Sequence, residues 1–279
     1  MNPLRSILVH LDASPRSIDR LVFARELAAS QGASVSAWYA NAPSAIDLPF
    51  LMSAGAGQAL ETLQELEATR NRAALDRFVR PLRDAPESMR WEELQGAALV
   101  RGTAQRALYC DLMVLGQHDR DDLSTLGIPS DFAASVIIES GKPALIVPYI
   151  GRPKTLGTTV LVAWKPTREA ARALSAALPL LRRATQLHWV AAPERDPPVA
   201  ARGLLEAFMR EHGVEATLTQ HGAVADGSAG EGLLSRAADV GADLLVMGCY
   251  GHSRAREFVV GGATRTVLQS MTLPVLMAH

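Results

Sequence analysis

Three glycines near the carboxy-terminal end have the spacing of a phosphate-binding loop. An apolar run that starts at Asp243 ends at Gly248, and Gly251 and Gly261 follow before a segment typical of a helix. Glycine lets a chain that leaves a strand turn tightly, so that its N–H groups can converge on an anion. The N-terminus of the following helix adds partial positive charge at the same place. The pattern predicts a phosphate site, with turn formation alone as the alternative.

Residues around these glycines complete the predicted site. His252 and Arg254 lie in the loop, and the expected helix begins after Gly262. Lys165, at the end of another predicted strand, could reach a phosphate or carboxylate, and a solvated lysine is the favoured alternative. The full predicted set for binding a nucleotide or phosphate is Ala163, Lys165, Gly248, Gly251, His252, Arg254, Gly261, Gly262, Ala263 and Thr264.

The two halves of the chain resemble each other in sequence. The segment DLMVLG at 111–116 matches DLLVMG at 243–248, and the strand-like runs at 6–12 and 159–165 also correspond. A repeat of this length indicates two domains of ordinary size. The linker GRPKTLG at 151–157 places them at residues 1–151 and 152–279.

Within each half, short β-branched apolar runs alternate with amphipathic helical segments. This rhythm predicts an α/β fold with a parallel, doubly wound sheet of five strands in each half. Ligands in such sheets bind beyond the carboxyl ends of the strands, where the glycine loop lies. The expected strands are 6–11, 33–42, 89–97, 111–116 and 143–149, then 159–164, 185–192, 214–222, 243–248 and 273–279; a long helix is expected over 58–80.

Composition narrows the functional class. Apolar residues make up 48% and charged residues 20% of the chain, and the net charge is -1, so disorder and a strongly basic nucleic-acid surface are not indicated. Residues 1–150 carry 14 basic against 18 acidic side chains and residues 151–279 carry 14 against 11, so the second half is the better host for an anion. Two cysteines and no long apolar run favour a cytoplasmic protein without a membrane segment.

The loop Gly248, Gly251, Gly261, followed by a helix and a last strand entered through Pro274, resembles that of the universal stress protein family. The resemblance implies two tandem five-stranded α/β sandwich domains, Rossmann-like and similar to the adenine nucleotide alpha hydrolases. Many members of that family bind ATP, with Mg²⁺ when the ligand is a triphosphate, and others do not. Members pair through their last strands, which implies an internal pseudo-dimer here and leaves open a homodimer of two chains.

The two halves depart from the family pattern in complementary ways. In the first half Asp12 stands at the family's acidic position and Gly116 remains, but Asp119 replaces the second glycine. The acidic loop around Asp119 should repel a triphosphate. Asp12 could be a remnant ribose ligand, and a turn or capping role is favoured. In the second half Lys165 holds the acidic position, and Gly262 stands where the family has Ser or Thr.

No catalytic motif accompanies the loop: a P-loop, G-x-S-x-G and H-E-x-x-H are all missing from the sequence. The leading hypothesis is a stress-response binding or regulatory module whose second half holds an adenine nucleotide or another phosphate ligand. The alternative is an interaction protein of the same fold that binds no nucleotide. A weak ATP hydrolase ranks last, because only fold-level analogy supports it.

Overall fold

A computed structural model describes residues 4–41, 65, 69, 72–74, 76, 78, 89–94, 98–125, 127–151, 153–191, 199–222, 229–250 and 262–279. The chain divides into two compact units. The amino-terminal unit is Arg5–Ser140, and the carboxy-terminal unit is Gly141–His279 together with Met1–Leu4. The units are described separately below.

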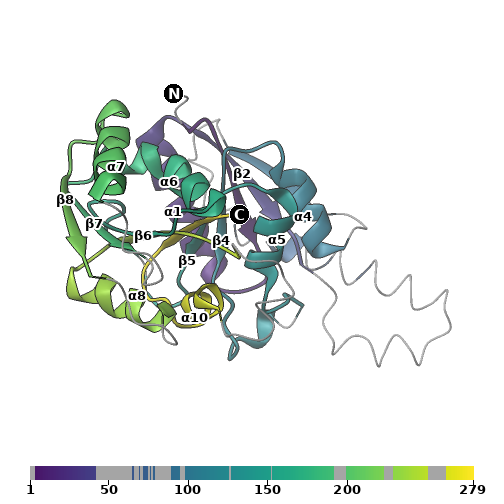
Figure 1. Ribbon diagram of the computed structural model, residues 1–279. Helices are drawn as coiled ribbons and strands as arrows, with labels where there is room; N and C mark the ends of the chain where they lie inside the picture. Colours follow the sequence, from purple (N-terminus) through teal and green to yellow (C-terminus); the bar gives the residue numbers. More distant parts are fainter. Residues whose placement is uncertain are drawn as a thin grey trace. The chain divides into compact units, whose positions relative to one another are not determined.

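The amino-terminal unit contains a parallel sheet with the strand order β3-β2-β1-β4 (Figure 1). Strands β1, β2 and β4 are short, mostly apolar and buried, as expected for strands covered on both faces, whereas the edge strand β3 is largely polar and only partly buried. The strands are β1 (Ser6–Leu11), β2 (Ser34–Tyr39), β3 (Met89–Glu93) and β4 (Leu112–Gly116); the helices are α1 (Arg16–Gln31), α4 (Leu99–Ala107) and α5 (Phe132–Ser140), with a 3₁₀ turn, η2, at Leu123–Thr125.

Helices cover both faces of this sheet. The side chain of Arg20 in α1 lies over Gly116 of β4, whereas the indole of Trp38 in β2 donates a hydrogen bond to Thr103 of α4. Successive residues of a strand point to opposite faces, and the register of β2, β1 and β4 places these two contacts on opposite sides. Helix α4 packs beside α5 on the second face.

The carboxy-terminal unit contains a sheet with the order β5-β10-β9-β6-β7-β8 (Figure 1). All its pairs are parallel except β5 with β10. The strands are β5 (Ala144–Val147), β6 (Thr159–Trp164), β7 (Gln186–Ala191), β8 (Thr217–His221), β9 (Leu244–Gly248) and β10 (Val275–Ala278); the helices are α6 (Arg168–Leu181), α7 (Val199–Glu211), α8 (Ala229–Asp239) and α10 (Ala263–Ser270).

Two helix contacts shape this unit near the glycine loop. Helix α6 packs over β9, β10 and β6. Helices α8 and α10 lie side by side, so close that a Cβ on Gly230 would come 2.6 Å from the Cβ of Thr266. Glycine is therefore needed at this crossing because a methyl group has no room.

The expected fold class is confirmed: all ten strands form within the segments predicted for them, and helices alternate with them. Most of the helix expected over 58–80 lies outside the described residues. Strand β5 groups with the carboxy-terminal unit because it pairs with β10, so the compact units divide at Ser140 and Gly141. A domain boundary at residue 151 stays a prediction. In the described part of the chain, every helix is too short or too polar to cross a membrane.

Candidate functional site

The carboxyl ends of β6, β9 and β10 meet at one edge of the carboxy-terminal sheet, because these three strands are parallel. Gly248 ends β9, Lys165 directly follows β6, and Ala163 pairs with Met247. This edge is where an α/β sheet binds its ligands. The predicted site residues Gly251, His252, Arg254 and Gly261 lie outside the described residues.

Helix α10 connects β9 to the parallel strand β10, so its N-terminus lies toward the same edge. Gly262 is the N-cap, with extended backbone (φ -66°, ψ 144°) and no side-chain cap. Ala263 and Thr264 form the first turn, and Thr264 is buried. The first backbone N–H groups of α10 therefore have no capping side chain and are suited to bind an anion.

A second helix N-terminus lies at this edge. Thr167 caps α6 by accepting a hydrogen bond from the N–H of Ala170 at 3.4 Å. A Cβ on Gly248 would lie 2.6 Å from that same nitrogen and 2.8 Å from the carbonyl carbon of Glu169. The glycine that ends β9 is thus required by the close approach of α6, whatever its part in ligand binding.

Replacing Gly248 with alanine is expected to destabilise the carboxy-terminal unit by about 1–3 kcal/mol, because backbone atoms of α6 must shift to admit the methyl group. The matched control is Gly203→Ala in α7, where a Cβ meets no atom within 4 Å. That exchange should be neutral or stabilising by up to about 1 kcal/mol, since alanine favours a helix. Urea unfolding of the two variants measures the contrast, and equal stabilities would refute the steric argument.

Glu169 brings negative charge to the same place, a feature that the sequence analysis missed. Its carboxylate is 4% exposed and accepts a hydrogen bond from Nε of the exposed Arg168 at 2.6 Å. Burial raises the pKa of Glu169, but hydrogen bonds from Arg168, its own backbone and Thr167 outweigh burial and hold the pKa below its usual value. The group is therefore an anion near Gly248, and it disfavours a second anion placed against α6.

The chain enters the loop through a strained residue. Cys249 is fully buried, and its N–H donates to the carbonyl of Ala278 at 2.9 Å. Tyr250 then takes a φ of 52°, in the left-handed region that bulky side chains rarely adopt. Tyr250 is the last described residue before Gly251.

In the amino-terminal unit, the matching edge is filled by the protein's own side chains. Asp12, which directly follows β1, accepts a hydrogen bond from Nη2 of Arg20 at 2.8 Å, and both side chains are 6% exposed. The same carboxylate accepts bonds from the N–H of Ser14 and the hydroxyl of Ser17. Asp12 thus stabilises the turn after β1 and forms a buried ion pair, so its oxygens are not accessible to a ribose.

Arg20 also covers the glycine that ends β4. A Cβ on Gly116 would lie 1.7 Å from Nη1 of Arg20, so the guanidinium occupies the space directly above this residue. The loop that follows is closed in a similar way: the carboxylate of Asp119 accepts from the N–H of Asp121, and that of Asp122 from the N–H of Ser124. These two backbone donors of the loop therefore already have carboxylate partners.

A buried histidine supports this closed edge. His10 lies in β1, its Nε2 is 2.8 Å from the carbonyl oxygen of Ala40, and its ring packs against Phe132 with centroids 4.6 Å apart. Burial lowers the pKa of His10 to about 4; Asp12 acts in the opposite direction and Arg20 in the same one. The imidazole is therefore neutral at physiological pH, and it donates to Ala40.

Comparison with known proteins identifies the carboxy-terminal half. Residues 158–279 match the model of the universal stress protein family. The carboxy-terminal half is therefore a domain of this family. A universal stress protein of Synechocystis sp. is 44% identical over 50 residues, which cover 18% of this chain and 17% of that relative. The matched part of the relative is short, so nothing about its activity follows for this chain.

Solved structures extend the likeness of the fold to nearly the whole chain. A universal stress protein from Archaeoglobus fulgidus aligns over 97% of this chain and 94% of its own, with a TM-score of 0.70 and 15% identity. A putative universal stress protein from Pseudomonas aeruginosa aligns over 98% and 92%, with a TM-score of 0.59 and 19% identity. At these identities the comparison concerns architecture alone.

Proposed function

We propose that this universal stress protein is a tandem binding module whose carboxy-terminal unit holds an adenine nucleotide or another phosphate-bearing ligand, and whose amino-terminal unit holds none. The observation that carries the proposal is the contrast at the two carboxyl edges. In the amino-terminal unit, Arg20 lies over Gly116. In the carboxy-terminal unit the corresponding residue is Ala173, which follows Lys165 by the same number of residues as Arg20 follows Asp12. A buried alanine at that position cannot close the site with a charge.

Three features support an anion as the ligand of the carboxy-terminal unit. The uncapped N-terminus of α10 and the N-terminus of α6 both lie toward the edge where Gly248 ends β9. Each contributes partial positive charge that favours a phosphate. Lys165, half-buried after β6, adds a full positive charge. Glu169 opposes them, so binding is expected to be weak, and weakest for a triphosphate.

The decisive experiment is calorimetric titration of the full chain with ATP, ADP and AMP, the triphosphate with and without Mg²⁺. Replacing Gly251 with valine should weaken nucleotide binding at least about tenfold, because a β-branched side chain obstructs a loop that binds through its backbone. The matched control is Asp119→Val, which introduces the same side chain at the corresponding position of the amino-terminal unit. Its affinity should equal that of the parent, and a loss shared by both variants counts against the proposed site.

The second candidate function is an interaction protein that binds no nucleotide. The closed edge around Asp12 and Arg20 favours it, because one half has already exchanged a ligand site for an internal ion pair. Mass analysis of small molecules released on denaturing the purified protein separates the candidates. A copurified nucleotide supports the nucleotide-binding module. Its absence, together with no heat of binding in the calorimetric titration, supports the interaction protein.

A dedicated enzyme is the least supported reading. Only analogy of fold supports it. We propose instead a binding and regulatory role in the cytoplasm, with weak ATP hydrolysis as the most that a magnesium and ATP time course should show. The pairing of β5 with β10 is the basis for proposing pseudo-dimeric pairing of the last strands.

A further inference from the structure

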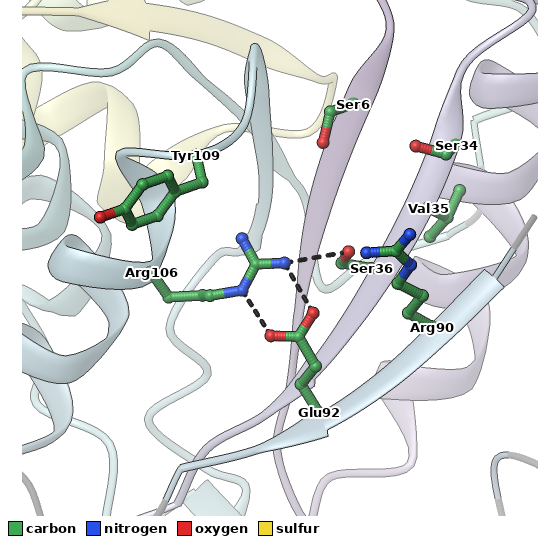
Figure 2. Close-up of a pocket in the computed structure, with 8 residues that line it drawn as sticks. All are labelled: Ser6, Ser34, Val35, Ser36, Arg90, Glu92, Arg106 and Tyr109. Atoms are coloured by element: carbon green, nitrogen blue, oxygen red, sulfur yellow. Dashed lines mark hydrogen bonds and ion pairs between the residues drawn. The ribbon is translucent and has the colours of Figure 1, made fainter.

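A polar cavity of about 330 Å³ lies at the amino-terminal ends of the strands in the amino-terminal unit, opposite the edge discussed above (Figure 2). Ser6 and Ser34 begin β1 and β2 and are directly paired, and Tyr109 follows α4. The cavity is lined by Ser6, Ser34, Val35, Ser36, Arg90, Glu92, Arg106 and Tyr109.

The strand register explains why this part of the sheet is polar. Ser36 pairs with Arg90, and residues two apart on a strand share a face, so Ser34, Ser36, Arg90 and Glu92 all point to the side of α4. Elsewhere this face is apolar and buried, as at Leu8. Small hydroxyl side chains leave the space that the cavity occupies.

Arg106 is held rigidly at the centre of the cavity. Its Nε donates to one oxygen of Glu92 at 2.5 Å, and its Nη2 donates to the other at 2.6 Å. Nη2 also donates to the hydroxyl of Ser36 at 3.1 Å. The paired carboxylate raises the pKa of Arg106, so the guanidinium is always charged. Figure 2 shows the remaining nitrogen, Nη1, without a partner among the residues drawn.

Arg90 gives the cavity a second guanidinium, on the edge strand β3 and exposed. Together Arg90, Arg106 and Glu92 leave the lining with a net positive charge. Asp111, at the same end of the sheet, already accepts from the N–H groups of Arg5 and Ser6 at 2.8 and 3.0 Å. Within the part of the chain that the structure describes, Nη1 of Arg106 and the guanidinium of Arg90 are donors of the kind that a carboxylate or phosphate group binds.

We propose that this cavity is a second ligand site, for a small metabolite that carries a carboxylate or phosphate group. The oxyanion binds between Nη1 of Arg106 and the guanidinium of Arg90, and the rest of the molecule extends past Ser6 toward Tyr109. A volume of about 330 Å³ lies at the small end of the range for such sites. The fixed guanidinium of Arg106 lowers the cost of binding because Glu92 has already ordered it.

The test is a titration of the full chain with inorganic phosphate and, separately, with succinate, followed through the backbone amide NMR shifts of Ser34, Ser36 and Arg90. Both probes are added to the Gly251→Val variant, so that the glycine loop does not contribute. Saturable shifts with one or both probes are expected, and the better probe identifies the oxyanion. Arg90→Gln should weaken binding at least about tenfold, because it removes a charge-assisted contact.

Two further variants keep the outcome decisive. Arg101→Gln removes one positive charge from an exposed position of α4 outside the cavity and should leave the affinity unchanged. Arg106→Gln should abolish binding. If that variant unfolds, Arg90→Gln still tests the site, because Arg90 is exposed on the edge strand β3. The proposal is overturned if neither probe gives saturable shifts at these amides, or if Arg101→Gln weakens binding as much as Arg90→Gln.

Discussion

Replacing Arg20 with methionine is expected to lower the free energy of unfolding of the amino-terminal unit by about 3–5 kcal/mol. The exchange leaves the carboxylate of Asp12 buried without its cationic partner. Burial raises the pKa of Asp12, but Arg20 and His10 hold it below its usual range, so the group stays ionised. A buried charge that loses its partner is far more costly than the pair itself is stabilising. Urea unfolding, with pulsed deuterium exchange of the peptide that contains β1, measures the loss.

Two variants test whether the buried charge is the cause. Adding Asp12→Asn to Arg20→Met should recover much of the lost stability, because a neutral amide then replaces the buried carboxylate. Arg16→Met, at an exposed position of the same helix, should change the free energy of unfolding by less than about 0.5 kcal/mol. If the double variant is no more stable than Arg20→Met, packing of the arginine side chain is the cause and the electrostatic argument is wrong.

The fold could be predicted from the sequence because its signals are local. Runs such as SILVHL and DLLVMG are short, apolar and bounded by turn residues, which is sufficient to place β1 and β9. Alternation with amphipathic helices then requires parallel strands and sets the edge where ligands bind. Gly248 illustrates the limit of such reasoning. The sequence marks it as a loop glycine, whereas the close approach of α6 is a separate reason for its presence.

The closed edge of the amino-terminal unit could not be predicted in the same way. Its closure depends on Arg20 reaching across from α1 to Asp12 and Gly116, and the spacing within the helix does not show which strand end lies opposite. One signal was present: Arg20 lies beside Leu21 and three residues after Ser17, on the mostly apolar, buried face of an amphipathic helix. A charged residue on such a face, near an acidic strand end, indicates a buried ion pair.

Two other polar features were also missed for reasons of tertiary structure. Glu169 looked like an ordinary acidic residue in the first turn of a helix, where the helix dipole favours it even when exposed. Its burial follows from the packing of α6 on β9. Similarly, Ser34, Ser36, Arg90 and Glu92 gave a strand-like alternation but no sign of a cavity, because the strand register and the reach of Arg106 from α4 create it.

The stability of the amino-terminal unit is expected to fall by about 3 kcal/mol as the pH is lowered from 6.5 to about 4, because of His10. In the unfolded chain this histidine gains a proton below pH 6.5, whereas in the folded unit it stays neutral until about pH 4. The unfolded state binds more protons over that interval, so acid favours unfolding, by up to about 1.4 kcal/mol per pH unit. Above pH 6.5 His10 contributes no pH dependence.

Replacing His10 with glutamine isolates this effect, because the amide can still donate to Ala40 and does not titrate. The variant is expected to be less stable at neutral pH, since it loses the packing on Phe132, and to show a shallower pH dependence down to pH 4. The stability must be followed by deuterium exchange of the peptide that contains β1, which reports on the amino-terminal unit alone. His188 and His221 in the carboxy-terminal unit also have lowered pKa values and destabilise that unit in acid. Parallel pH profiles for the parent and the variant would show that His10 is not the group responsible. Below about pH 4 the two profiles should converge in slope, because Asp12, whose contribution is lost only at still lower pH, remains in both proteins.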